Sequence, residues 1–139
     1  MRQVDAHVQR RLVEKGLDIS RIHMMVLKTV NHRGPQPQTD LAFITDRDKT
    51  SLVRLIDTMV RKGLVVRELS PTDKRVNLIK LTPKGLVKLK EAEPVVISIF
   101  EELQAGITEA ERKVVLAAMQ TIQDNACRDK DLCQEITTT

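Results

Sequence analysis

Hydroxyl and cationic side chains gather at the start of one amphipathic segment in the middle of this 139-residue chain. Lys49, Thr50 and Ser51 open the segment, and Arg54 follows one helical turn later. Short hydroxyl groups bond base edges or phosphates, and arginine can bond guanine through two donors at once. The same residues also suit an ordinary solvated helix face, so their neighbours must decide between the two interpretations.

A second charged group lies in a short turn downstream, where Asp73, Lys74 and Arg75 follow Ser-Pro-Thr. The flanking runs 64–69 and 76–81 are rich in Val, Ile and Leu, which predicts the two strands of a hairpin. A cation at the tip suits a narrow minor groove, where the negative potential is enhanced. Asp73 is unsuited to touching DNA, and we expect it to brace the Arg75 guanidinium. A turn that is merely exposed and charged is the alternative.

Local signals predict the elements that position these groups. A short helix starts at Gln38 or Thr39, residues 45–48 form a tight polar turn, and a longer helix runs to about Lys62, where Gly63 ends it. A helix pair followed by a charged hairpin is the layout of a winged helix-turn-helix. That layout places one helix in the major groove and a basic loop beside it.

The longer helix divides into two faces. Four apolar side chains fall within an arc of about 100°, and polar side chains occupy the opposite side. The apolar positions are Leu52, Leu55, Ile56 and Met59, and the polar ones are Thr50, Arg54, Asp57 and Arg61.

Further helices flank this region on both sides. Asp18 or Ser20 can cap a helix over residues 19–32, which Gly34, Pro35 and Pro37 end. Thr82-Pro83 starts a helix that should kink or break near Pro94. Thr108–Glu111 has the spacing of a capping box and opens a last helix.

Each terminal helix carries one narrow apolar stripe. The stripes comprise Val4, Val8 and Leu12 at the N-terminal end, and Val115, Met119, Ile122 and Ala126 at the C-terminal end. On a lone subunit such stripes would leave apolar area exposed, which favours dimerisation. Packing into the core of the same subunit is the alternative.

The charge is distributed unevenly along the chain. Residues 47–90 hold 12 Lys/Arg against 4 Asp/Glu, whereas residues 91–139 hold 4 against 10. A basic middle suits a polyanionic partner, because neutralised phosphates release counterions. We expect the acidic C-terminal part to face away from that partner.

Several classes of function find no support in the sequence. No run approaches the roughly 20 apolar residues that span a bilayer, and the charged start lacks a secretion signal, so we expect a cytoplasmic protein without a membrane partner. No catalytic, phosphate-binding or metal-ligand constellation is visible, which argues against an enzyme, a cofactor or a metal site. Free reduced thiols are expected at Cys127 and Cys133, with a redox role as the alternative.

The central run LAFITDRDKTSLVRLIDTMVRKGLVVRELSPTDKRVNLIKLTPKG resembles the MarR family of bacterial transcriptional regulators. The matching pieces include Asp-Lys-Thr-Ser at the helix start, Lys-Gly-Leu-Val, and Asp73-Lys-Arg75 before Leu-Thr-Pro-Lys-Gly. They cover about a third of the chain closely, and the order of the flanking helices fits over nearly all of it. The combination is specific, although each piece alone is weak.

The resemblance implies a homodimer whose terminal helices interleave, and a palindromic DNA operator. It assigns DNA contacts to Lys49, Thr50, Ser51 and Arg54, and to Arg75 braced by Asp73. Val53 stands where many members carry Thr or Ser, and its side chain suits a thymine methyl group instead. Many members also bind small anions in a crevice, and the helix that carries Arg21, His23 and Met24 would border it here. Roles in the core or on the surface are the favoured interpretation of these three residues.

We therefore predict a mainly α fold with a small β-hairpin wing, that is, a winged helix-turn-helix with dimerisation helices at both ends. The boundaries are residues 1–18 for the N-terminal dimerisation helix, 19–85 for the DNA-binding domain and 86–139 for the C-terminal dimerisation helices. The predicted function is a dimeric repressor of a palindromic operator on double-stranded DNA, with release by a small-molecule effector left open. The alternatives are a winged-helix protein-interaction module without a DNA role, and a redox-sensing regulator using Cys127 and Cys133.

Overall fold

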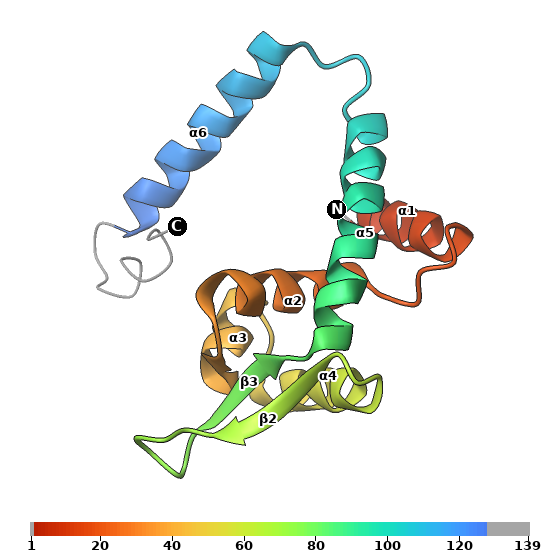
Figure 1. Cartoon of the computed structure of the whole chain (residues 1–139). Helices are drawn as coiled ribbons and strands as arrows, with labels where there is room; N and C mark the ends of the chain where they lie inside the picture. The colour runs from red at the N-terminus through yellow and green to blue at the C-terminus, as the bar shows by residue number, and fades with distance from the viewer. Residues whose placement is uncertain (1, 128–139) are drawn as a thin grey trace. The chain divides into compact units, whose positions relative to one another are not determined.

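The computed structural model describes residues 2–127 of the chain, which form six helices and three strands within that range (Figure 1). One unit takes in the chain as far as Glu101, and a second unit begins at Glu102. The elements, in chain order, are α1 (Arg2–Glu14), α2 (Arg21–Arg33), β1 (Gln36–Pro37), α3 (Gln38–Ile44), α4 (Lys49–Arg61), β2 (Val65–Leu69), β3 (Asn77–Leu81), α5 (Pro83–Leu103) and α6 (Glu109–Cys127).

Helix α2 begins with a reciprocal cap. The Ser20 hydroxyl accepts a hydrogen bond from the backbone N–H of His23, and the Ser20 N–H donates to Nδ1 of His23 at 3.2 Å. His23 takes the position that Glu or Gln usually holds in such a box, so two otherwise unsatisfied donors are paired. The cap fixes the start of the helix on which the main core is built.

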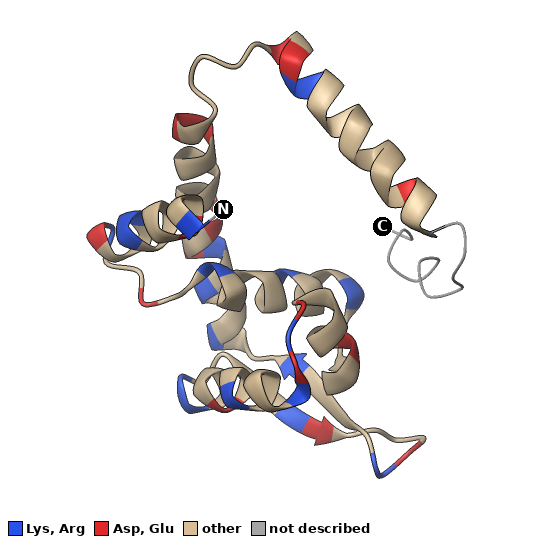
Figure 2. Ribbon diagram, turned by 180° about the vertical axis from the view of Figure 1, so that it is seen from behind, with Lys and Arg blue, Asp and Glu red and all other residues tan. Residues whose placement is uncertain are grey.

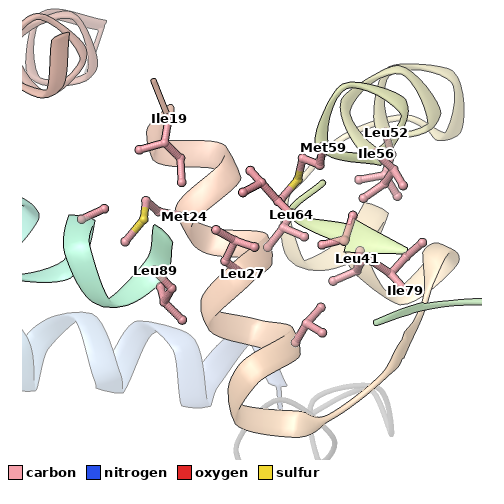
Figure 3. Packing of buried hydrophobic residues seen from close by; sticks show 14 residues of the cluster. Ile19, Met24, Leu27, Leu41, Leu52, Ile56, Met59, Leu64, Ile79 and Leu89 are labelled. Carbon is pink, nitrogen blue, oxygen red and sulfur yellow. The ribbon is translucent and has the colours of Figure 1, made fainter. Parts of the chain in front are cut away.

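The main core of the first unit surrounds α2. Figure 3 shows apolar side chains from α2, α3, α4, α5 and the sheet converging there, with Leu27 of α2 among them. Fourteen buried residues form this cluster: Ile19, Met24, Val26, Leu27, Val30, Leu41, Leu52, Ile56, Met59, Leu64, Val65, Ile79, Leu89 and Ala92. None of the fourteen side chains is aromatic, so aliphatic and methionine side chains build this cluster.

The predicted hairpin is present, and a third short strand completes the sheet. Strands β2 and β3 pair antiparallel from Val65↔Leu81 to Leu69↔Asn77, and β1 pairs with the other edge of β3. We expected Pro35 and Pro37 only to end a helix. Pro37 sits at an edge strand, where a missing N–H costs least.

Helix α5 is attached closely to the hairpin. The Thr82 hydroxyl accepts from the N–H of Gly85, so the predicted cap is confirmed. A Cβ on Gly85 would lie 2.0 Å from the Leu64 carbonyl oxygen, so only glycine allows this approach. We expected a kink or a break near Pro94; the helix runs through Pro94 to Leu103 without a break. Packing along its length outweighs one lost backbone bond.

The second half of α5 forms a smaller cluster with α1. Val8 and Leu12 are fully buried against Ile99, with Val4 and Phe100 at the edge of the cluster. The stripe on α1 therefore packs within its own subunit, which was the alternative to dimerisation. Val8 and Leu12 leave no exposed surface for a partner, because α5 offers a matching apolar face nearby.

Helix α6 makes up the described part of the second unit. The predicted capping box is confirmed: Thr108 Oγ1 accepts from the Glu111 N–H, while Glu111 accepts from the Thr108 N–H. This backbone hydrogen bond from Thr108 is the main cause that lowers the pKa of Glu111. Within the chain, every described side chain of α6 is exposed.

Candidate nucleic-acid interface

The turn between α3 and α4 fixes the direction in which α4 leaves it. Thr45 is buried and its hydroxyl donates to the Leu41 carbonyl at 2.6 Å. Asp46 adopts a left-handed conformation with φ of 51°, which Asp tolerates better than most residues. The Arg47 backbone N–H then donates a hydrogen bond to the Ala42 carbonyl. The second helix of the pair is therefore held by backbone and buried hydroxyl contacts.

Asp48 caps the start of α4. Its carboxylate accepts from the Ser51 N–H at 2.8 Å and from the Ser51 hydroxyl at 2.7 Å. The backbone hydrogen bond from Ser51 is the main cause that lowers the pKa of Asp48. The Ser51 hydroxyl is thus committed to the cap, whereas Lys49 and Thr50 are exposed beside it. Of the three predicted contacts at this helix start, Lys49 and Thr50 have side chains that face solvent.

The two faces of α4 match the predicted division. Leu52, Ile56 and Met59 are at most 1% exposed and face the core. Thr50, Arg54 and Arg61 are exposed on the other side, and Val53 is half-buried between the faces. The exposed face therefore presents one hydroxyl group, a guanidinium group one turn later and a second guanidinium group two turns after that.

The wing tip holds Arg75 as we expected. Asp73 Oδ1 accepts from the Arg75 backbone N–H at 3.0 Å and from Nε at 3.2 Å, and Oδ2 accepts from Nη2 at 3.4 Å. The backbone hydrogen bond from Arg75 is the main cause that lowers the pKa of Asp73. The Arg75 side chain remains 91% exposed, so the brace orients the guanidinium without covering it. Lys74 is exposed beside it.

Helix α4 and the wing lie at the same end of the first unit, as both ribbon views show (Figures 1 and 2). Figure 2 also shows Lys and Arg positions along α4 and at the wing tip. Part of the basic middle of the sequence is thereby gathered at this end of the first unit (Figure 2). Such a surface attracts a polyanion.

A cavity of about 190 Å³ lies between α2 and α5. Most of its lining is apolar, and its rim carries charged side chains; the lining residues are Arg21, Met24, Met25, Lys28, Glu93, Val96, Ile97 and Phe100. Lys28 pairs with Glu93 at 3.4 Å, and Arg21 pairs with Asp5 at 2.8 Å. Arg21 and Met24 thus line the cavity, whereas His23 serves the cap of α2.

The remaining predicted positions lie in the second unit. Val115, Met119 and Ile122 of α6 are 54–68% exposed, and Ala126 is exposed as well. Cys127 ends α6, and Cys133 lies outside the described residues. Among the described residues, no group of His, Cys, Asp and Glu side chains is arranged to hold a metal ion.

Arg67 is a residue of this region that our sequence interpretation missed. It lies on β2 yet donates to α3 and α4, and it forms an ion pair with Asp57 at 2.7 Å. The sequence did contain a signal for this role. Side chains two positions apart on a strand lie on the same face, and Val65, two positions before Arg67, is fully buried. An arginine on the inward face of a strand needs partners there.

Comparisons of the sequence with known proteins find similarity to transcriptional regulators. The sequence model of the MarR family matches residues 17–76. A putative transcriptional regulatory protein for the hcr operon of Thauera aromatica is 29% identical over 97 residues, which is 70% of this chain. Because the match takes in 58% of that relative's length, the chain spans little more than half of it.

Solved structures show the same fold. A mutant MarR from E. coli complexed with operator DNA is 25% identical, with a TM-score of 0.78 over 87% of this chain and 86% of that one. BpsR of Bordetella bronchiseptica, whose DNA binding is regulated by 6-hydroxynicotinic acid, is 21% identical. Its TM-score is 0.78 over 88% of this chain and 86% of that one. In the described part of our chain, no helix has both the length and the apolar character needed to cross a membrane.

Proposed function

We propose that this chain is a member of the MarR family of bacterial transcriptional regulators, and that it is a sequence-specific repressor that binds double-stranded DNA as a homodimer. The observation that carries the proposal is that two exposed arginine side chains lie on neighbouring elements at one end of the first unit. Arg54 is exposed on a rigid capped helix, and Arg75 is braced by Asp73 on the adjacent wing. A protein with this function would act in the cytoplasm.

In this proposal α4 is the recognition helix and enters the major groove. Thr50 and Arg54 contact base edges, and Lys49 neutralises a phosphate near the helix start. Ser51 acts mainly through the cap, with its backbone near the phosphates, and Val53 contacts a thymine methyl group from the rim of the helix. Arg75 enters the neighbouring minor groove, with Lys74 on the adjacent phosphates.

The dimer is proposed to form through α6. Val115, Met119, Ile122 and Ala126 fall within an arc of about 60° at 100° per residue, so they make one continuous apolar stripe. An exposed stripe of this kind needs a covering surface, and the same helix of a second copy supplies one. Two copies would present two recognition helices, as a palindromic operator requires.

We further propose that the cavity between α2 and α5 takes a small effector. Its apolar lining suits a compact carbon skeleton. An acidic group on that skeleton would exchange with Asp5 or Glu93 as the partner of Arg21 or Lys28. The ligand could act only through unequal affinity for the DNA-bound and free conformations. Small aromatic and aliphatic carboxylic acids are therefore the first compounds to screen.

Fluorescence anisotropy with labelled DNA from the region upstream of the gene tests the proposed function. We expect binding at moderate salt at least about a thousandfold tighter than to a shuffled duplex of equal length. We also expect log Kd to rise steeply with log salt, because several phosphates are neutralised. Equal, weak binding to both duplexes with a shallow salt slope would refute the proposal and favour a protein-interaction module.

A further inference from the structure

Arg67 joins three elements at the base of the wing. From its position in the middle of β2, its Nη2 atom contacts Asp57 Oδ1 at 2.7 Å and the Val53 carbonyl of α4 at 3.4 Å. Its Nε atom donates to Gln38 Oε1, at the start of α3, at 3.3 Å. Its side chain is 29% exposed, against 91% for Arg75, so it is engaged with protein rather than presented to solvent.

We call these three contacts of Arg67, with Asp57, the Val53 carbonyl and Gln38, the joint. An arginine side chain suits them better than a lysine. A guanidinium offers five donors in a fixed plane, so it can bond a carboxylate, a carbonyl and an amide oxygen at the same time. Lysine has a single charged nitrogen at the end of a flexible stem and cannot reproduce that geometry. Because Arg67 follows the buried Val65 by two positions, the strand itself aims the side chain at α4.

The ion pair also affects the DNA-facing side of α4. Asp57 lies three residues after Arg54 and four before Arg61, at spacings where side chains of one helix interact. With its carboxylate held by Arg67, Asp57 does not compete for Arg54. Among the described residues, no ion pair involves Arg54, and its side chain is exposed. The joint thus keeps a DNA-reading arginine available.

Arg67 also lies at a point where the hairpin contacts α4. The hairpin is joined to α3 through the short strand β1 on one side and to α4 through Arg67 on the other. A change in hairpin tilt at Arg67 would move the distant tip, and with it Arg75. We propose that Arg67 is a positioning residue that sets recognition helix and wing at one angle, so that Arg54 and Arg75 reach the same DNA site together. This inference rests on the proposed function.

Double-mutant cycles on operator affinity test the proposal, with Arg75→Ala made in four backgrounds. The backgrounds are wild type, Arg67→Ala, Arg67→Lys and the control Lys80→Ala. Lys80 pairs with Glu68 at 3.6 Å across the same wing, so its removal changes the charge equally without touching α4. Affinity is measured by anisotropy on the operator and on random DNA at one salt concentration.

We expect Arg75→Ala to weaken operator binding about tenfold in the wild-type and Lys80→Ala backgrounds. In the Arg67→Ala background the additional loss should fall to about twofold or less, because a misplaced wing no longer makes the contact. Arg67→Lys should lie between the two, since it restores charge without the geometry. A purely structural role would lower the melting temperature of the Arg67 variants but leave the tenfold effect of Arg75→Ala intact.

The outcomes separate the inference from the proposed function. An unchanged tenfold effect of Arg75→Ala in folded Arg67→Ala overturns the inference, while wild-type operator binding still supports the proposed function. Absence of operator preference in the wild type refutes the proposed function itself. If Arg67→Ala is unfolded by circular dichroism, Asp57→Asn replaces it, because that change removes the ion pair and keeps the shape of the side chain.

Discussion

Arg54 and Arg75 carry the same charge on different elements, and we expect their loss to show in different measurements. Arg54→Ala should reduce the ratio of operator to random binding about tenfold or more, because a bidentate contact to guanine reads sequence. Arg75→Ala should weaken binding to both DNAs and lower the salt slope by about one. Anisotropy titrations across salt concentrations measure both effects. Equal losses on operator and random DNA for both variants would contradict these roles.

Replacing Asp73 is a test in which charge and geometry predict opposite changes in DNA affinity. Removing an acidic side chain near DNA should by charge alone tighten binding. The brace predicts the reverse: Asp73→Ala should weaken operator binding several-fold, because it releases the guanidinium of Arg75. Glu68→Ala is the matched control, since it removes the same charge from the same wing. Tighter binding by both variants would show that the brace has no role in DNA affinity.

For single residues, the sequence predicts those side-chain contacts whose two partners lie close together along the chain. Asp73 and Arg75 are two apart, and Asp48 and Ser51 are three apart, so spacing alone brings them together. Arg67 escaped prediction because Gln38 lies 29 positions away and becomes its neighbour only when the sheet has formed. Gly85 shows the same limit, since its need for glycine comes from the distant Leu64 carbonyl.

Helix α2 depends on a cap that responds to pH. Burial is the main cause that lowers the pKa of His23 below its ordinary 6.5; Lys62 and Arg47 act in the same direction, and Asp18 opposes them. The folded chain therefore binds a proton less readily than the unfolded chain. This contribution to stability is complete above pH 6.5 and is lost as the pH falls through the lowered pKa. Protonation also removes the acceptor for the Ser20 N–H.

His23→Gln isolates this effect, because glutamine keeps an acceptor at the third position of the cap without a titrating group. We expect the free energy of unfolding of the wild type to fall as the pH is lowered below 6.5, and that of the variant to change less over the same range. Urea titrations at several pH values measure the difference. Parallel pH profiles for the two proteins would exclude His23 as the source.

The elements themselves were predictable to different extents. Helix α4, the hairpin and the starts of α5 and α6 have caps, turns and apolar periodicity within their own residues. Strand β1 was missed because two residues with a proline become a strand only through pairing with Ile79 and Leu78. The stripe of α1 was recognised, but a stripe does not say which surface covers it.

At the scale of the whole molecule, the proposed dimer predicts that one exposed position of α6 controls DNA binding. Met119→Asp should produce a monomer and weaken operator binding about a hundredfold or more, because the two half-sites are then bound independently. Light scattering after gel filtration and anisotropy measure the two effects. Thr121→Asp is the matched control, since it adds the same charge on the other side of α6. A dimeric Met119→Asp variant with unchanged affinity would remove α6 from the proposed interface.

Helix α5 belongs to both apolar clusters of the first unit, through Leu89 and Ala92 at one end and Ile99 at the other. Because both clusters include α5, we expect them to unfold cooperatively. Neither cluster can come apart without exposing apolar side chains of the same helix. Amide hydrogens in the middle of α5 should then exchange with deuterium only through global opening. The first unit accordingly behaves as one cooperative body, from the N-terminal helix to the base of the wing.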